Sequence, residues 1–254
     1  MTMNFPVEVC SDERVFEVNE GLSLLQKKNA LAFGTDAFLL AAFCRGQARA
    51  RAVEFGCGNG IVSLLLAEKG KLSHITALEI QQEMADLATR NVVLNHLTDR
   101  IAVREGDVRT LTAADLGGEV EVALANPPYM RVDSGYASPH AAKQTARHEA
   151  EGGIAEFAAA AARCVKFGGV FYTVYRPDRL ETLFAALRDA RFAPKRMVFV
   201  HDHPEAEPSM VLTEAKRGAG EGLAILPPLV LHSKKGEAAL SPRAAKIYET
   251  GEFF

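Results

Sequence analysis

One segment, Val53-Glu54-Phe55-Gly56-Cys57-Gly58-Asn59-Gly60, limits the folds open to this 254-residue chain more than any other. An apolar, strand-like stretch leads into three alternating glycines, and a helix-like stretch follows at residues 61–69. Alternating glycines let the backbone approach a ligand, and the start of a helix presents unpaired N–H groups to a carboxylate or phosphate. The segment therefore predicts a strand, a ligand-binding loop and a helix of an α/β sheet.

The spacing of these glycines distinguishes between cofactors. Dinucleotide-binding loops have the pattern Gly-x-Gly-x-x-Gly, whereas Gly56, Gly58 and Gly60 follow Gly-x-Gly-x-Gly, with Glu54 ahead of them. An acid at that place suits an ammonium group. S-adenosylmethionine carries an ammonium, a carboxylate and a ribose, so this loop fits its amino-acid end better than it fits NAD.

Two further acids follow strand-like runs. Glu79 ends the run at residues 74–78, at the usual position for a carboxylate that accepts both ribose hydroxyls. The run at residues 101–104 leads to Asp107 and Val108. The Asp107 carboxylate can accept from an adenine amino group, and the Val108 N–H can donate to the adenine ring. For each acid alone, an ordinary exposed residue at a strand end is the alternative.

A fourth strand-like run, residues 120–125, ends in Asn126-Pro127-Pro128-Tyr129. The Asn126 side chain offers an acceptor oxygen, and Pro127 fixes the backbone so that a carbonyl can face the same nitrogen. Tyr129 offers a flat face for stacking. This arrangement suits methylation of an exocyclic or amide nitrogen, and a proline-stiffened turn after a strand is the alternative. Taken together, the four strand ends predict one crevice in a doubly wound sheet.

The rest of the pattern alternates between helix and strand. Helices are expected at residues 81–95, at 153–167, where Gly168-Gly169 would stop the helix, and after Pro177-Asp178, with a strand at 170–175. Short β-type runs at residues 196–201, 209–215, 223–225 and 229–232 predict antiparallel hairpins at the far edge of the sheet. Asp36, just before residues 37–43, is expected to cap a helix.

The motifs Glu54–Gly60, Glu79, Asp107 and Asn126–Tyr129 together resemble those of class I S-adenosylmethionine-dependent methyltransferases that methylate amino groups. Residues 33–40, 146–149 and 211–229 are similar to the bacterial tRNA(Val) adenine-37 N6-methyltransferase group, so the resemblance runs from about residue 30 to 250. Two features depart from the family's pattern: Glu54 stands where Asp is commoner, and the tail motif ends in Leu226-Pro227-Pro228.

The resemblance implies a Rossmann-like α/β fold with a mostly parallel seven-stranded sheet and an antiparallel C-terminal strand. It implies S-adenosylmethionine as cofactor and N6-methylation of adenosine 37 in the anticodon loop of tRNA(Val). The implied catalytic residues are Asn126, Pro127 and Tyr129. The implied cofactor-binding residues are Glu54, Gly56, Gly58, Gly60, Glu79, Asp107, Val108 and Asn126. An adenine in a loop is a cheap target, because flipping a base out costs less there than in a duplex.

Other substrates stay open. A glutamine N5-methyltransferase of release factors would use the same Asn-Pro-Pro-Tyr, but that group has a helical domain ahead of the glycine loop, for which little room exists here. A DNA adenine methyltransferase needs a target-recognition region that 254 residues hardly supply. An rRNA base is a further target. A non-catalytic RNA-binding scaffold is the alternative outside enzymology, and the intact Asn126 and Tyr129 argue against it.

Charge is unevenly distributed along the chain. The net charge is −3, unusual for a protein that binds RNA phosphates. Residues 1–126 carry 12 Lys and Arg against 17 Asp and Glu, whereas residues 127–254 carry 17 against 15. A phosphate track is one interpretation of the basic residues, and a mixed solvated surface is the other. The residues concerned are Lys27-Lys28, Lys195-Arg196, Lys216-Arg217, Lys234-Lys235 and Arg243.

Length and 48% hydrophobic content suit one catalytic domain, expected at residues 46–254, with an N-terminal extension at 1–45 packed on it. Four cysteines lie far apart without a Cys-x-x-Cys pair, which argues against disulfides and zinc. Because His201-Asp202-His203 gives no closed ligand set, no metal is expected. A cytoplasmic location follows from the cysteines and from the lack of a signal peptide or long apolar run.

One long segment between expected elements, residues 130–147, contains Gly135, Ser138 and Pro139 and directly follows the Asn-Pro-Pro-Tyr. Loops of this length are often functional. We hypothesise a lid that orders over the flipped base, with Arg131, Lys143 and Arg147 near the phosphates.

Overall fold

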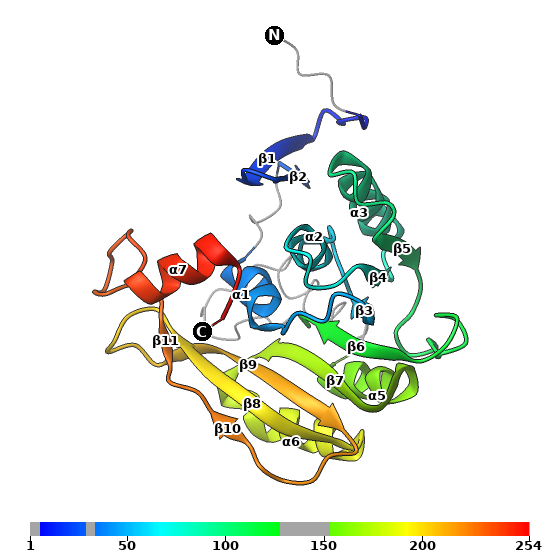
Figure 1. The fold of residues 1–254 in the computed structure, drawn as a ribbon. Helices are drawn as coiled ribbons and strands as arrows, with labels where there is room; N and C mark the ends of the chain where they lie inside the picture. Colours follow the sequence, from blue (N-terminus) through cyan, green and yellow to red (C-terminus); the bar gives the residue numbers. More distant parts are fainter. Residues whose placement is uncertain (1–5, 29–33, 128–152, 254) are drawn as a thin grey trace, which may run out of the picture.

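The computed structural model describes residues 6–28, 34–127 and 153–253. Its centre is a sheet in the order β10-β8-β9-β7-β6-β3-β4-β5, with β11 beside β8 (Figure 1). The strands are β3 (Arg51–Phe55), β4 (His74–Glu79), β5 (Ile101–Glu105), β6 (Val120–Ala125), β7 (Val165–Tyr175), β8 (Phe192–His201), β9 (Pro208–Arg217), β10 (Ala224–Ile225) and β11 (Leu229–Val230).

The directions of the strands confirm the predicted mixed sheet. Strands β3 to β7 are mutually parallel, and β9 lies antiparallel between β7 and β8. The expectation of further antiparallel hairpins is wrong for the last two runs, because β10 and β11 pair parallel to β8. Each is only two residues long, and they extend the seven predicted strands to nine.

Helices cover both faces of the sheet, giving three layers (Figure 1). One buried cluster joins the sheet to α1 (Thr35–Phe43), α2 (Ile61–Glu68), α3 (Gln82–Leu94) and α7 (Pro242–Thr250). The other joins it to α5 (Ile154–Cys164) and to α6 (Leu180–Asp189), which follows the 3₁₀ turn η1 (Pro177–Arg179). Strand residues alternate between the clusters: Val122 and Leu124 belong to the first, Ala123 and Ala125 to the second.

One predicted boundary is wrong. The helix expected to reach residue 167 ends at Cys164, and β7 begins at Val165 and runs through Gly168 and Gly169. A Cβ at Gly169 would lie 2.5 Å from Val165 Cγ1 and 2.7 Å from the Glu121 carbonyl oxygen, so only glycine fits this close strand contact. The glycine pair therefore marks an irregular strand rather than a helix stop.

The N-terminal segment forms a separate antiparallel hairpin of β1 (Glu13–Asn19) and β2 (Leu22–Lys27). It is fixed to α3 by two asparagines one helical turn apart. The Asn91 amide accepts from the Leu25 N–H at 2.6 Å and donates to the Leu25 carbonyl at 2.9 Å. Asn95 makes the same pair of bonds with Ser23, at 2.8 and 2.7 Å. The two amides thus make hydrogen bonds to the backbone of β2 of the kind that a neighbouring strand would make.

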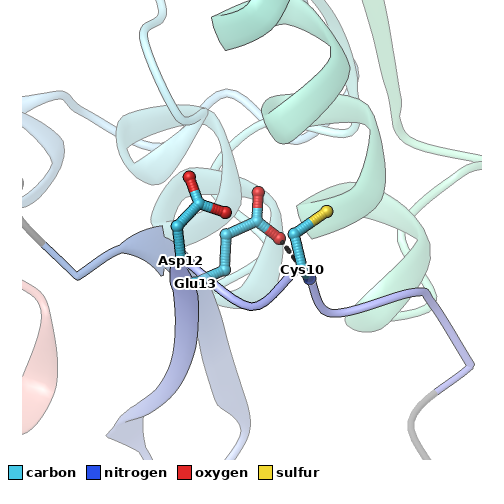
Figure 2. Close-up of side chains that lie close together, drawn as sticks. All are labelled: Cys10, Asp12 and Glu13. Atoms are coloured by element: carbon cyan, nitrogen blue, oxygen red, sulfur yellow. Dashed lines mark hydrogen bonds between the residues drawn. The ribbon is translucent and has the colours of Figure 1, made fainter.

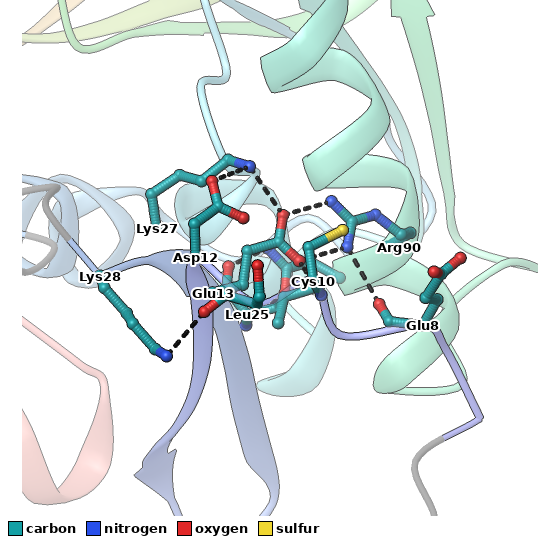
Figure 3. Close-up of polar contacts among 10 residues, drawn as sticks. Glu8, Cys10, Asp12, Glu13, Leu25, Lys27, Lys28 and Arg90 are labelled. Atoms are coloured by element: carbon teal, nitrogen blue, oxygen red, sulfur yellow. Dashed lines mark hydrogen bonds and ion pairs between the residues drawn. The ribbon is translucent and has the colours of Figure 1, made fainter.

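A charged cluster closes the base of this hairpin. Cys10, Asp12 and Glu13 lie together, and Glu13 Oε2 accepts from the Cys10 N–H at 2.9 Å (Figure 2). The Glu13 carboxylate lies between Arg90, at 2.7 Å, and Lys27, at 3.1 Å (Figure 3). Hydrogen bonding to Arg90 holds the Glu13 pKa well below its usual range. The Glu13 carboxylate is therefore paired with cations of the protein itself. Because Arg90 belongs to α3, this ion pair anchors the hairpin to that helix. The boundary between an N-terminal extension, residues 1–45, and a catalytic domain, residues 46–254, stays a prediction.

Candidate active site

Four loops leave the sheet at the same edge. In the central parallel strands, Phe55 of β3 pairs with Leu78 of β4 and with Ala125 of β6, and Glu79 pairs with Glu105 of β5. The segments that follow these strands carry the glycine loop, Glu79, Asp107 and Asn126. The sheet thereby brings the predicted site residues to adjacent carboxyl ends, where α/β folds bind ligands.

The glycine loop has the backbone that only glycine adopts easily. Gly56, Gly58 and Gly60 have φ angles of +65°, +57° and +85°. The loop is fixed to β4 through the Cys57 N–H, which donates to the Leu78 carbonyl at 2.9 Å, and the Gly58 N–H, which donates to Glu79 Oε2 at 2.8 Å. Helix α2 begins at the next residue, Ile61, so its N-terminus lies directly beside the loop.

Glu79 is oriented by backbone donors on both of its oxygens. Besides the Gly58 bond, Oε1 accepts from the Gln81 N–H at 3.0 Å, and the residue is only 6% exposed. Each carboxylate oxygen has a second lone pair for a hydroxyl of a ligand. Binding of ribose by Glu79 stays a prediction.

Glu54 has a partner within the protein. It is 2% exposed, and its Oε2 accepts from the Ser63 N–H at 2.9 Å and from the Ser63 hydroxyl. Burial raises the pKa of the Glu54 carboxyl to about 7, although the hydrogen bonds from Ser63 oppose this shift. The carboxylate thus stabilises the first turn of α2 by accepting these hydrogen bonds. Its contact with a ligand ammonium stays a prediction.

Asp107 is also engaged. Its oxygens bind the Arg109 guanidinium, with Nη2 to Oδ2 at 2.6 Å, and accept from the Arg109 N–H at 2.8 Å. This pairing lowers the Asp107 pKa. The Val108 side chain is buried, and its carbonyl accepts from Arg163 Nη2 at 2.7 Å. Within the described ranges no hydrogen bond uses the Val108 N–H. The adenine-binding role of both residues stays a prediction.

Asn126 is half-buried, directly after β6, and Pro127 behind it is buried. The Asn126 amide nitrogen donates to Asp36 Oδ2 at 3.0 Å. Asp36 is not the helix cap that the sequence predicts, because α1 already begins at Thr35 with Gly34 at the cap position. Its Oδ1 accepts from the Ala37 N–H at 2.9 Å. Pro128, Tyr129 and the hypothesised lid at 130–147 lie outside the described residues.

Sequence reasoning missed several residues around this site. A Cβ at Gly58 would lie 3.9 Å from Met84 Cε, and one at Gly56 would lie 3.7 Å from the Phe157 ring. Asn91, fully buried on α3, donates to the Asn59 carbonyl of the glycine loop at 3.0 Å. An asparagine on the otherwise apolar face of a helix was the available signal, because a buried amide needs partners.

The basic residues proposed for a phosphate track differ in availability. Arg196 is buried: its guanidinium donates to the Phe43 carbonyl at 2.5 Å, lies over the Phe43 ring and pairs with Glu214 at 3.0 Å. Arg196 is therefore part of the interior and is removed from the track. Lys27 pairs with Asp12 and Glu13, and Lys195 donates to the carbonyls of Gly220 and Glu221. No helix among the described residues has the length and apolar character to span a membrane.

Comparison with known proteins agrees with this arrangement. The sequence profile of the methyltransferase small domain family matches residues 28–185. A tRNA1(Val) (adenine(37)-N6)-methyltransferase from Phocaeicola vulgatus is 29% identical over 187 residues, 74% of this chain and 77% of that protein. One of the same name from Bacteroides thetaiotaomicron is 30% identical over 186 residues, 73% of this chain and 76% of the relative. The resemblance predicted from the motifs is thereby confirmed.

Solved structures agree in fold. A crystal structure described as a predicted O-methyltransferase from Agrobacterium tumefaciens superposes with a TM-score of 0.69 at 24% identity, and it covers 87% of this chain and 98% of its own. At that identity the match supports the fold alone. Because the family profile covers more than half of the sequence, the chain belongs to the methyltransferase small domain family.

Proposed function

We propose that this protein transfers a methyl group to the N6 amine of an adenine in tRNA, with adenosine 37 of the tRNA(Val) anticodon loop as the target. The observation that carries the proposal is Asn126, which follows β6 beside the glycine loop and whose amide nitrogen is bound by Asp36. That bond leaves the amide oxygen as the atom that can accept from an amine. The protein is a methyltransferase, as its family membership states, and its methyl donor is S-adenosylmethionine.

The chain's residues fit this donor. Gly56, Gly58 and Gly60 have positive φ and carry no Cβ, and their loop lies next to the N-terminus of α2, where a carboxylate is favoured. Glu79, oriented by two backbone N–H groups, suits ribose hydroxyls. Asp107 and the Val108 N–H suit an adenine edge. S-adenosylmethionine supplies a methyl group already activated by its sulfonium sulfur, so no covalent intermediate with the protein is needed.

The protein's part in the chemistry is to hold the amine and to stabilise charge. The exocyclic amine of adenine is conjugated and weakly nucleophilic. Acceptance by Asn126 Oδ1 and by the Pro127 carbonyl favours a pyramidal nitrogen and stabilises the positive charge that develops as the N–C bond forms. The nitrogen then releases one proton to water, which leaves a neutral secondary amine. Tyr129 is proposed to hold the plane of the base.

The tRNA target is supported by the relatives, which carry the name tRNA1(Val) (adenine(37)-N6)-methyltransferase and match this chain over about three quarters of their length. It is also supported by the excess of basic over acidic residues in the half of the chain that follows Asn126. The base must leave its stack to reach a site at a sheet edge, and an anticodon loop makes this cheaper than a duplex does.

The test is nucleoside mass spectrometry of tRNA lacking the modification, incubated with S-adenosylmethionine and the protein. Two transcripts of tRNA(Val) separate target from bystander adenines: one with A37 and one with G37. We expect N6-methyladenosine only from the first. Asn126→Ala should abolish the product while S-adenosylmethionine binding, measured by calorimetry, changes little.

Asn19→Ala is the matched control, because Asn19 lies at the turn of the N-terminal hairpin, where its side chain accepts from the Gly21 N–H. It should retain full activity. Methylation of both transcripts would show that the protein methylates a tRNA adenine other than A37. No methylated nucleoside from either transcript or from bulk tRNA would overturn the proposal.

A further inference from the structure

Asp36 and Asn126 form a link between the first turn of α1 and the end of β6. Among the described residues, the Asp36 carboxylate accepts from the backbone N–H of Ala37, at 2.9 Å on Oδ1, and from the side-chain amide of Asn126, at 3.0 Å on Oδ2. The α1 backbone fixes the first bond, so the carboxylate cannot turn freely. The second bond therefore joins Asn126 to a rigid element that lies far away in the sequence.

This link determines which end of the Asn126 amide is available. An asparagine amide has one acceptor atom and one donor atom, and the two differ little in shape. A carboxylate only accepts, so Asp36 selects the orientation in which Nδ2 faces α1. Oδ1 is then the end left for a substrate. Negative charge beside the N–H groups also draws the amide towards its dipolar form, which places more negative charge on Oδ1.

We propose that Asp36 is a positioning residue for methyl transfer: its carboxylate holds Asn126 with Oδ1 towards the target amine and strengthens that oxygen as an acceptor. The inference rests on the proposed function, because it assigns the effect of Asp36 to the amine that Asn126 receives. Asp36 does not touch the amine and exchanges no proton with it. Its contribution is orientation and charge, which matter most when the nitrogen becomes positive.

Asp36→Asn tests the orientation, because the amide that it introduces has nearly the same shape as the native carboxylate. The new amide has one acceptor atom, whereas the Ala37 N–H and the Asn126 amide group each need one. With its oxygen on the Ala37 N–H, its NH2 group faces Asn126, whose own amide must then flip and offer Oδ1 to α1. Nδ2 would be turned to the substrate, where it repels an amine that needs an acceptor. We expect a fall of about 100-fold in the single-turnover rate at saturating S-adenosylmethionine and tRNA.

The reciprocal change provides a rescue. Asn126→Asp alone places two carboxylates about 3 Å apart and should also be slow, since like charges at this distance repel. Combining Asp36→Asn with Asn126→Asp restores one donor facing one acceptor and still leaves an oxygen for the amine. The double variant should react at least about tenfold faster than the slower single variant, which is the non-additivity expected of residues that are directly coupled.

Three readouts separate positioning from a loss of structure. The melting temperature and the Kd for S-adenosylmethionine should change little in Asp36→Asn, while the rate falls. The side-chain amide protons of Asn126, assigned by their absence in Asn126→Ala, should shift in the nitrogen–proton NMR spectrum of Asp36→Asn. Asp99→Asn is the matched control: Asp99 is exposed and pairs only weakly with Arg100, at 4.0 Å, so the rate should be unchanged.

Each outcome counts for or against the proposal. An unchanged rate in Asp36→Asn would overturn it, as would a double variant that reacts less than about tenfold faster than the slower single variant. A parallel loss of melting temperature and cofactor affinity would assign Asp36 to structure alone and would also overturn it. If the native protein transfers no methyl group to tRNA, the proposed function fails first and this inference falls with it. That case is recognised before any variant is made.

Discussion

The ring of Tyr248 lies flat against the ring of Phe38, with centroids 4.1 Å apart and 3° between the planes. Tyr248 belongs to α7 and Phe38 to α1, and a side-chain hydrogen bond joins Tyr248 to Thr35. Burial, as the largest cause, raises the Tyr248 pKa. The C-terminal helix therefore holds the first turn of α1, where Asp36 meets Asn126.

Loss of this contact should affect stability and catalysis together. Tyr248→Ala removes the stacked ring, and we expect the free energy of unfolding to fall by about 2 kcal/mol, less than for a fully buried aromatic residue. The rate of methyl transfer should fall as well, because the first turn of α1 loosens. Urea unfolding and single-turnover kinetics measure the two effects. Tyr248→Phe keeps the stack and loses only the bond to Thr35, so it should lie close to the native protein; equal losses in both variants would contradict the stacking argument.

The sequence predicted the centre of this fold better than its ends. Strand β3, the glycine loop and α2 could be predicted because a buried parallel strand, alternating glycines and an apolar helix each have a local pattern. That the four strand ends meet at one crevice was also predicted, whereas the order β6-β3-β4-β5 is known only from the structure. Helix α7 was missed, although Ser241 caps it by accepting from the Ala244 N–H and Gly251 ends it with a φ of +69°. Both cap signals stand in the sequence, after the last β-type run that was predicted.

The positions of the site residues were predictable, and their contacts were not. A strand end gives the place of Glu54, Glu79, Asp107 and Asn126, but the partner of a side chain depends on how the elements pack in the folded protein. Ser63 on Glu54 and Asp36 on Asn126 are examples. The sequence predicts Asp36 as a cap because Asp is common there, whereas Gly34 holds the cap position and α1 begins at Thr35. The direction of β10 and β11 was equally beyond a local pattern.

Asn91 should couple the hairpin to the glycine loop. Asn91→Leu keeps the branched shape of the side chain but leaves the Leu25 N–H and the carbonyls of Leu25 and Asn59 without their amide partners, which should cost about 3 kcal/mol. Amide hydrogen exchange should increase along β2, and affinity for S-adenosylmethionine should fall. Asn95→Leu is the matched control, because Asn95 binds Ser23 of the hairpin and not the glycine loop. It should increase exchange in β2 without changing cofactor affinity, and equal affinity losses in both variants would contradict this division.

Gly58 should resist substitution because of its backbone angle. A Cβ there would lie 3.9 Å from Met84 Cε, which is ordinary contact, so the cost of Gly58→Ala is the left-handed conformation, about 1–2 kcal/mol. The loop can relieve this strain by moving, and the bond from the Gly58 N–H to Glu79 would then lengthen. We expect weaker S-adenosylmethionine binding by calorimetry. Gly220→Ala is the control, because nothing lies within 4 Å of a Cβ at Gly220. Unchanged affinity in Gly58→Ala would remove this loop from the proposed cofactor site.

Glu54 should make stability depend on pH in a definite direction. Burial raises its pKa from 4.5 to about 7 in the folded protein, so between these values the folded state holds a proton that the unfolded state has lost. The free energy of unfolding therefore falls as pH rises through this range. In Glu54→Gln the side chain is neutral throughout and can still accept from the Ser63 N–H. From pH 4 to pH 8, this variant should gain on the order of 2–3 kcal/mol relative to the native protein in urea unfolding.

The same variant separates two roles for this carboxylate. If Glu54 only anchors α2 through Ser63, Glu54→Gln should bind S-adenosylmethionine nearly as tightly as the native protein at pH 8, whereas a direct ammonium contact would be lost and the affinity would fall at least about tenfold. Glu119→Gln is the control, because Glu119 is exposed and pairs with Arg217 only at 3.5 Å. Glu119→Gln should bind S-adenosylmethionine as tightly as the native protein. A stability difference between Glu54→Gln and the native protein that does not change with pH would show that the buried carboxyl does not titrate near pH 7, and the hydrogen bonds from Ser63 would then outweigh its burial.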